Sequence, residues 1–266
     1  MNTHVTAEQI QSYQDNGFIV LEDFLTDEEL EYWREAVDGE VEERRHQKLD
    51  GTAAGGREDF YGNVFLQLML LSRTNEKVHD LFHDPELSRM VTELAQVDGI
   101  RLWHDQALYK EPWANPTSWH FDCPYWSFNS QDSISIWVAL DDATIQNGCM
   151  YYIPGSHKVA DFHWTNIGQN MGEIFQEYPE FGKRDPVPAP VKAGGAALHN
   201  GLTAHAAGPN MTSGYRRAMT CGYMPDGATY NGRPHGSVLS KKYIESLEVG
   251  DLIDNDDCVP LLYSKS

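Results

Sequence analysis

Between Arg101 and about residue 225 the chain is built from short apolar runs separated by Gly, Pro, Asn and Asp. Such runs predict β-strands, and a long series of them predicts an all-β sandwich or barrel. The expected strands are Arg101–Tyr109, Trp119–Asp122, Ser133–Leu140, Met150–Ile153, Gly195–His199, Thr203–His205 and Arg216–Tyr223. This series constrains the fold more than any other feature of the sequence.

The first hundred residues have a helical pattern instead. Thr6 and Gln9 have the spacing of a capping box, and the helix that they begin is expected to end at Asn16-Gly17. The run 18–21 predicts a buried strand. A second helix is expected from Thr26 to about residue 45, with acidic residues in its first turn, as the helix dipole favours.

Residues 50–57, rich in Gly, predict a loop. A third helical region is expected over 76–95 with a break near Asp84-Pro85, because Pro lacks the donor that a helix interior needs. No linker or repeat divides the 266 residues, so we expect one domain over 1–266: a helical part of about 1–100, a β core of about 101–225 and a C-terminal extension of about 226–266.

Composition excludes several classes of protein. An apolar share of 41% with 7 Trp, 13 Tyr and 10 Phe is typical of a folded chain with a sizeable core. The formal charge of −20 argues against a nucleic-acid partner, which needs a basic surface. No apolar run is long enough to span a bilayer. The four cysteines lack metal-site or redox spacing and predict reduced thiols, and the polar N-terminus does not look like a signal peptide, so a cytoplasmic location is expected.

The stretch Trp119-His120-Phe121-Asp122 carries the first candidate site. In an extended strand alternate side chains share a face, so His120 and Asp122 would point the same way. With a second histidine from a distant strand they would make a 2-His-1-carboxylate triad, which leaves positions open on Fe(II). Alone, the motif is weak, because a hydrogen-bonded histidine and a surface aspartate are common.

The blocks that follow this motif make it specific. They are Trp137–Asp142, Asn147–Met150, Ile153–His157, His205, Gly208-Pro209-Asn210 and Gly214–Ala218. In this order the blocks resemble the phytanoyl-CoA dioxygenase (PhyH) family of Fe(II)- and 2-oxoglutarate-dependent oxygenases. The resemblance covers about 106–223, with a weaker match in the N-terminal helix and at 17–20. It implies a mainly β fold with α: a double-stranded β-helix, or jelly roll, of the cupin type, flanked by N-terminal helices.

The resemblance also implies roles for individual residues. His120, Asp122 and His205 would be the iron ligands and catalytic centre, and Arg216 would bind the distal carboxylate of 2-oxoglutarate. A guanidinium suits that role, because its fork meets a carboxylate with two parallel hydrogen bonds. Arg217 would point to the other face of the strand. Trp137 and Gln106 match positions that line the cosubstrate site in relatives. Three aromatic residues follow the iron motif and could contact the substrate: Tyr125, Trp126 and Phe128. For these five, ordinary core packing remains the alternative.

The implied activity is hydroxylation of an unactivated C–H bond of a small metabolite, with O2 as cosubstrate and decarboxylation of 2-oxoglutarate to succinate and CO2. The carboxylate of Asp122 favours hydroxylation over halogenation, because related halogenases have Gly or Ala there. Desaturation, ring closure and epimerisation stay open, as do a non-catalytic jelly-roll binding protein and a zinc hydrolase with the same ligands.

Several features bear on the substrate. The acidic balance favours a small molecule, amine-bearing ones included, over a coenzyme A thioester. The long segment 159–187 predicts an active-site lid that sets this choice. His104 and His199 could face the cavity, although a core histidine is the commoner outcome. The sequence does not determine whether the chain is a monomer or a homodimer.

Overall fold

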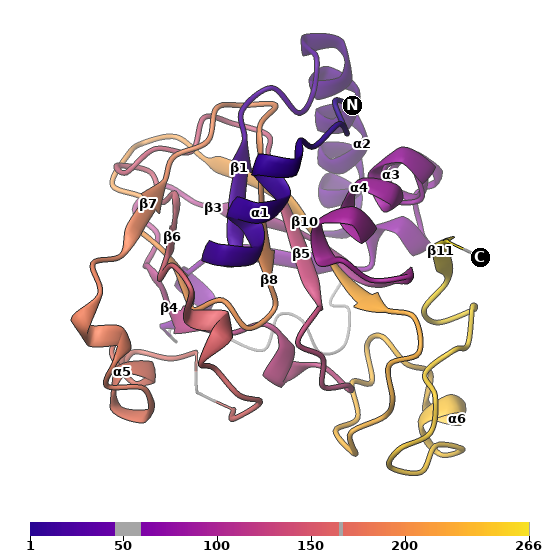
Figure 1. The fold of residues 1–266 in the computed structure, drawn as a ribbon. Coiled ribbons are helices and arrows are strands. Elements are labelled where there is room, and N and C mark those ends of the chain that lie inside the picture. The colour runs from indigo at the N-terminus through magenta and orange to yellow at the C-terminus, as the bar shows by residue number, and fades with distance from the viewer. Residues whose placement is uncertain (46–59, 165–166, 266) are drawn as a thin grey trace.

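Two antiparallel sheets face each other in a computed structural model, which describes residues 1–45, 60–164 and 167–265 (Figure 1). The helices are α1 (Ala7–Asn16), α2 (Asp27–Arg44), α3 (Glu76–Phe82), α4 (Pro85–Ala95), α5 (Ile174–Glu177) and α6 (Lys241–Ile244). The strands are β1 (Phe18–Leu21), β2 (Leu66–Met69), β3 (Gly99–Lys110), β4 (Thr117–His120), β5 (Ile134–Ala139), β6 (Met150–Tyr152), β7 (Val187–Ala189), β8 (Ala196–Asn200), β9 (His205–Ala207), β10 (Arg216–Pro225) and β11 (Leu261–Ser264).

The larger sheet has seven strands in the order β1-β8-β5-β10-β3-β11, with β2 also paired to β3. The smaller sheet has four strands in the order β4-β9-β6-β7. Neighbours in both sheets are antiparallel and lie far apart in sequence. This is the jelly roll that the sequence predicts, and α1 to α4 cover the outer face of the larger sheet (Figure 1).

The two helices predicted near the N-terminus are confirmed, together with their capping residues. In α1 and α2 the capping boxes of Thr6 with Gln9 and of Thr26 with Glu29 are complete, and α1 ends at Gly17 in the left-handed region, with φ of 81°. The third helical region is broken where proline predicts, into α3 and α4. Its second half is capped by Asp84, which accepts from two main-chain N–H groups. The loop expected at 50–57 lies outside the described residues.

Side-chain alternation on β10 divides the structure into a core and a cavity. Met219, Cys221 and Tyr223 belong to the apolar core that the larger sheet shares with the helices. Thr220 and Gly222, on the opposite face, line a space between the two sheets. The outer face therefore holds bulky side chains, and the inner face leaves room for ligands.

Three strands were not expected from the sequence. The apolar run 64–71 contains β2, and the C-terminal extension, in which the sequence shows no motif, ends in β11. Both pair with the same edge of β3, β2 along its second half and β11 along its start. The third, β7, extends the smaller sheet. These strands are short, and their partners are remote in sequence, so no local pattern identifies them.

Other expectations have mixed outcomes. All four cysteines are buried and unpaired, as reduced thiols would be. Within 159–187, Tyr178 and Phe181 pack against Phe121 of the iron motif, whereas a lid function for this segment stays a prediction. Among the helices of the described residues, none has the length and apolarity that a membrane span requires.

We predict that Asp105→Ala lowers the free energy of unfolding by roughly 2–4 kcal/mol. Asp105 is fully buried on β3 and accepts hydrogen bonds from the main-chain N–H of Leu71, at 2.7 Å, and from the N–H and hydroxyl of Ser72. Without the carboxylate these buried donors lose their acceptor. Urea denaturation measures the change. Asp98→Ala, at a fully exposed carboxylate, is the control and should unfold like the parent; equal midpoints for both variants would contradict the prediction.

Candidate active site

The two histidines of the predicted triad come from neighbouring strands of the smaller sheet. His120 ends β4, His205 begins β9, and the two are directly opposite each other in the antiparallel register. Their ring centroids are 4.1 Å apart. The fold thus brings together two imidazoles that are remote in sequence.

Asp122 reaches the same place by a turn, which corrects the expected strand Trp119–Asp122. The strand ends at His120, and Asp122 has helical angles (φ −80°, ψ −51°) at the start of a 3-10 helix, Cys123–Tyr125. The turn is held by the carbonyl of Gly201, which accepts from the N–H groups of Asp122 and Cys123 at 3.0 and 2.9 Å. The expected strand Thr203–His205 is also shifted, to His205–Ala207, because Asn200–Thr203 form the turn that carries this carbonyl.

The three side chains present their ligand atoms to one point. The Nε2 atoms of His120 and His205 lie 3.8 and 3.6 Å from Oδ1 of Asp122, and the ligand atoms all lie within 4.8 Å of one another. Each Nδ1 is bonded to a main-chain carbonyl, that of Ser118 at 2.7 Å and that of Thr203 at 2.9 Å. These bonds assign the ring protons to Nδ1 and leave the Nε2 lone pairs for a metal.

Burial keeps both imidazoles ready to bind a cation. It lowers the pKa of His120, and it lowers the pKa of His205 well below the ordinary value. Burial alone would raise the pKa of Asp122, but the adjacent His205 and His199 bring it below the ordinary value. Two neutral imidazoles and one carboxylate are the donor set that suits Fe(II).

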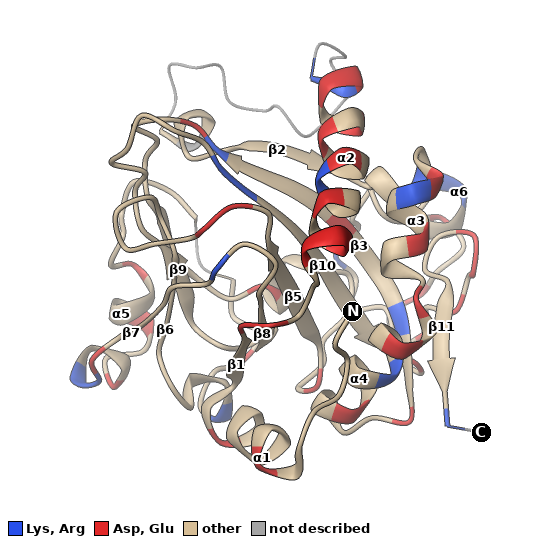
Figure 2. Cartoon of the chain, turned by 90° about the horizontal axis from the view of Figure 1, so that it is seen from above, with Lys and Arg blue, Asp and Glu red and all other residues tan. Residues whose placement is uncertain are grey.

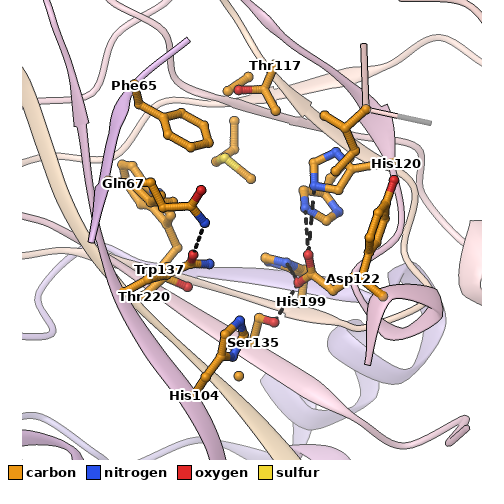
Figure 3. A pocket seen from close by; sticks show the side chains of 18 of the residues that line it. Phe65, Gln67, His104, Thr117, His120, Asp122, Ser135, Trp137, His199 and Thr220 are labelled. Carbon is orange, nitrogen blue, oxygen red and sulfur yellow. Dashed lines mark hydrogen bonds and ion pairs between the residues drawn. The ribbon is translucent and has the colours of Figure 1, made fainter. Parts of the chain in front are cut away.

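The second oxygen of Asp122 is held by the larger sheet. Its Oδ2 accepts from the hydroxyl of Ser135 at 2.7 Å and lies 3.1 Å from Nε2 of His199 (Figure 3). The Tyr152 hydroxyl lies 3.2 Å from Nδ1 of His199 and fixes that ring in turn. Sequence reasoning missed the support by Ser135 and His199. These two residues are cross-strand partners on β5 and β8, a relation that only the register reveals.

A cavity of about 370 Å³ separates the two sheets and contains the triad (Figure 3). Of the other residues predicted for the site, five line it: Arg216, Trp137, Gln106, Tyr125 and Trp126. Gln106 is hydrogen-bonded to Gln67 of β2. Phe128 does not line the cavity; it is fully buried and packs edge-on against Trp103 at 5.1 Å.

Arg216 brings a buried positive charge into this cavity. The Cζ atom of its guanidinium lies 5.1 Å from the ring centroid of Trp137, over the face of the ring, and its Nε has no hydrogen-bond partner. Burial lowers the pKa of Arg216 to about 10, so the guanidinium stays charged at neutral pH. The cross-strand neighbour Lys110 is buried as well, and burial together with Arg216 lowers its pKa to about 6. Among the described residues, no carboxylate pairs with Arg216.

Arg217 behaves as strand alternation predicts. It lies on the outer face, where its guanidinium pairs with both oxygens of Asp141 and with Asp38. The two neighbouring arginines therefore differ in their ion pairing. Arg217 is paired with carboxylates of the protein, whereas the charge of Arg216 faces the cavity. An unpaired buried ion is costly, so an anionic ligand would be strongly favoured there.

Comparison with known proteins identifies the family. A sequence model described as phytanoyl-CoA dioxygenase (PhyH) matches residues 13–218. The chain belongs to the phytanoyl-CoA dioxygenase family. The predicted resemblance is thereby confirmed over most of the chain.

Relatives and solved structures are similar at a modest level of identity. The human "Phytanoyl-CoA dioxygenase, peroxisomal" is 25% identical, over 83% of this chain and 68% of its own. A "Methylphosphonate hydroxylase" of Gimesia maris is 25% identical, over 92% and 88%. The crystal structure of the non-heme alpha ketoglutarate dependent carbocyclase SnoK has a TM-score of 0.79 at 25% identity, covering 97% of this chain and 96% of its own. That of the epimerase SnoN with Fe3+, alpha ketoglutarate and nogalamycin RO has a TM-score of 0.74 at 24%, covering 96% and 98%.

The cavity fits the cofactors of this family. The His-Asp-His cluster has the donors for iron, and the guanidinium of Arg216, whose Nε has no hydrogen-bond partner, suits the free carboxylate of 2-oxoglutarate. Family membership and the triad together confirm the predicted cofactors: iron, 2-oxoglutarate and O2.

We predict that Ser135→Ala weakens Fe(II) binding about tenfold, because residues that orient a metal ligand typically contribute tenfold or more to affinity. Loss of the Ser135 hydroxyl frees Oδ2 of Asp122 to rotate. Competition with a chelator under anaerobic conditions measures the affinity. Ser213→Ala, at an exposed loop residue, is the matched control. Identical Fe(II) affinities in the two variants would show that Ser135 does not orient the carboxylate.

Proposed function

We propose that this protein is an Fe(II)- and 2-oxoglutarate-dependent dioxygenase that hydroxylates an unactivated C–H bond of a small-molecule metabolite. 2-Oxoglutarate would be converted to succinate and CO2. The observation that carries the proposal is the buried, anion-free guanidinium of Arg216 in the same cavity as the His-Asp-His cluster. A metal-binding site alone would not need that charge, whereas a 2-oxo diacid as cosubstrate would.

Each protein group has a defined task in this proposal. His120, Asp122 and His205 would hold iron, which with bound 2-oxoglutarate and O2 supplies the oxidising power. Arg216 would bind the distal carboxylate by two parallel hydrogen bonds, and Trp137 would keep its guanidinium in place. His205 and Arg216 are almost fully buried, so these charges would act in a space of low dielectric constant. The protein need not supply a general base.

Other oxidative outcomes form the second candidate function. SnoK is described as a carbocyclase and SnoN as an epimerase, and each superposes with this chain over nearly the full length of both proteins. Ring closure or epimerisation could therefore occur on this scaffold, since the outcome depends on where the target carbon is held. Hydroxylation is preferred because Asp122 is present, and because a relative of similar length is named a hydroxylase. A non-catalytic binding protein would not need the triad and Arg216 together, and a zinc hydrolase would not need an arginine at the 2-oxoglutarate position.

We predict that Arg216→Ala weakens 2-oxoglutarate binding by about 2–4 kcal/mol, the scale for removing one partner of a buried charge pair. The measurement is titration of the cosubstrate into the anaerobic Fe(II) protein. Arg217→Ala is the matched control on the same strand; it should lower stability through loss of the Asp141 pair but leave cosubstrate affinity unchanged. A larger effect at Arg217 would move the cosubstrate site to the other face.

We predict that Asp122→Ala abolishes both succinate release and substrate oxidation, because it removes the carboxylate ligand. Succinate is quantified in the presence of Fe(II), O2 and 2-oxoglutarate while a library of small metabolites is screened by product mass. The parent protein without Fe(II) serves as the baseline. Undiminished succinate formation in the variant would refute the assignment of Asp122 as an iron ligand.

We also propose that the protein is cytoplasmic, that it is organised as one domain, and that it acts on a small-molecule substrate without a nucleic-acid or membrane partner.

A further inference from the structure

The cavity has two ends that differ in charge. Along β10, Arg216 lies at one end, and Gly222, six positions further on, lies at the other. Gly222 is directly opposite His104 on one side and Ser135 on the other, in the cross-strand row that also contains His199. The row that holds Asp122 thus continues to His104, which lies beside Ser135 (Figure 3). His104 is paired with Gly222, six positions along β10 from Arg216.

His104 lines the cavity without a protein partner at Nδ1. It is 7% exposed, and this nitrogen makes no hydrogen bond. Gly222 makes the room for the ring, because a Cβ at that position would lie 3.0 Å from Nδ1 of His104 and 3.0 Å from Trp126. Burial lowers the pKa of His104 to about 3, so the ring is a neutral imidazole, able to donate one hydrogen bond and accept another.

His235 faces the same end of the cavity from the C-terminal extension. Its ring lies 6.2 Å from that of His104 and 5.8 Å from that of Trp103. The extension is fixed there by Arg233, which donates to the carbonyl of Pro124 at 2.7 Å, and by Asn231, which donates to that of Trp126 at 3.1 Å. A segment in which the sequence shows no motif therefore contributes to the site.

Fixed charges are few in this space. Of the described residues that line the cavity, only Asp122 and Arg216 carry them. Asp122 faces the metal position, and Arg216 faces the expected position of the 2-oxoglutarate carboxylate. At the far end, His104 has Trp126 and His235 as neighbours and Ser135 in the same cross-strand row, and none of these side chains is a carboxylate, guanidinium or amine. Acidic residues are instead prominent on the outside of the structure, along α2 (Figure 2).

We infer that the part of the substrate inside the cavity is uncharged, and that His104 and His235 determine specificity by holding one of its hydroxyl, ether or carbonyl oxygens. This inference rests on the proposed function and extends it to the substrate class. An ammonium group would find no second carboxylate among the described lining residues, and a carboxylate or phosphonate would find no second guanidinium or amine. Burying an unpaired ion costs several kcal/mol, whereas a neutral oxygen needs only hydrogen-bond partners.

The inference changes the expectation drawn from composition. The acidic balance of the chain favours amine-bearing molecules, but that charge acts at the surface and is screened by salt. Inside the cavity, the charge of the substrate is selected by the residues that line it. A volume of about 370 Å³ that must also hold 2-oxoglutarate limits the enclosed part of the substrate to a compact group.

The test uses probes of one shape and different charge. Cyclohexanecarboxamide is compared with cyclohexanecarboxylate, and cyclohexylmethanol with cyclohexylmethylammonium. Each is titrated by calorimetry into the anaerobic protein loaded with Fe(II) and 2-oxoglutarate. We expect each neutral probe to bind at least about tenfold more tightly than its charged counterpart. Equal or tighter binding of a charged probe would overturn the inference, and so would failure of both neutral probes to bind.

Variants of the two histidines test whether these residues cause the tighter binding of neutral probes. His104→Phe and His235→Phe keep a ring but remove its hydrogen bonds, and each should weaken carboxamide binding about fivefold. His79→Phe, at a half-exposed side chain on α3, is the control and should bind like the parent. Carboxamide affinity unchanged in both cavity variants would overturn the role of the histidines.

Titration of 2-oxoglutarate into the same samples separates this inference from the proposed function. Both cavity variants should bind 2-oxoglutarate like the parent. If the parent binds no 2-oxoglutarate, the proposed function fails, and the neutral-over-charged preference is then measured on the Fe(II) protein alone. If 2-oxoglutarate binds but the preference is absent, only the inference fails.

Discussion

The pairing of β4 with β9 is the interaction on which the rest of the site depends. It places His120 opposite His205, and the turn before β9 supplies the Gly201 carbonyl that bends the chain at Asp122. The His-Asp-His cluster is thus an outcome of main-chain hydrogen bonding in the smaller sheet. Side-chain bonds to main-chain carbonyls then orient both rings. Any change that separates these two strands would separate all three ligands.

The larger sheet contributes orientation and charge to this cluster. Ser135 and His199 hold the free oxygen of Asp122, and Arg216 brings a positive charge to the cavity. Small residues on the inner face of the sheet leave the cavity, and bulky residues on the outer face pack under the helices. One alternating pattern therefore serves both stability and ligand binding, because the two faces of each strand have different neighbours.

The two ends of the cavity differ in the chemistry of their lining residues. The end with the triad and Arg216 can serve any reaction that consumes 2-oxoglutarate. The other end is formed by His104 on β3 and by His235 from the C-terminal extension, which the family match at 13–218 does not include. If these histidines hold the substrate as we infer, substrate choice depends in part on a segment that the family match does not include.

Local sequence patterns determined much of this protein: the helix caps at Thr6 and Thr26, the break at Pro85, the strand series and the separation of Arg216 from Arg217 by alternation. Such features depend on neighbours within a few residues, and the metal and cosubstrate residues were predicted through their resemblance to a family. Only the tertiary structure decided that Asp122 sits on a turn, that Ser135 and His199 support it, that β2 and β11 share an edge, and that His235 reaches the cavity. Each of these depends on which distant segments pair, and that choice is made by packing and hydrogen bonding across the whole chain.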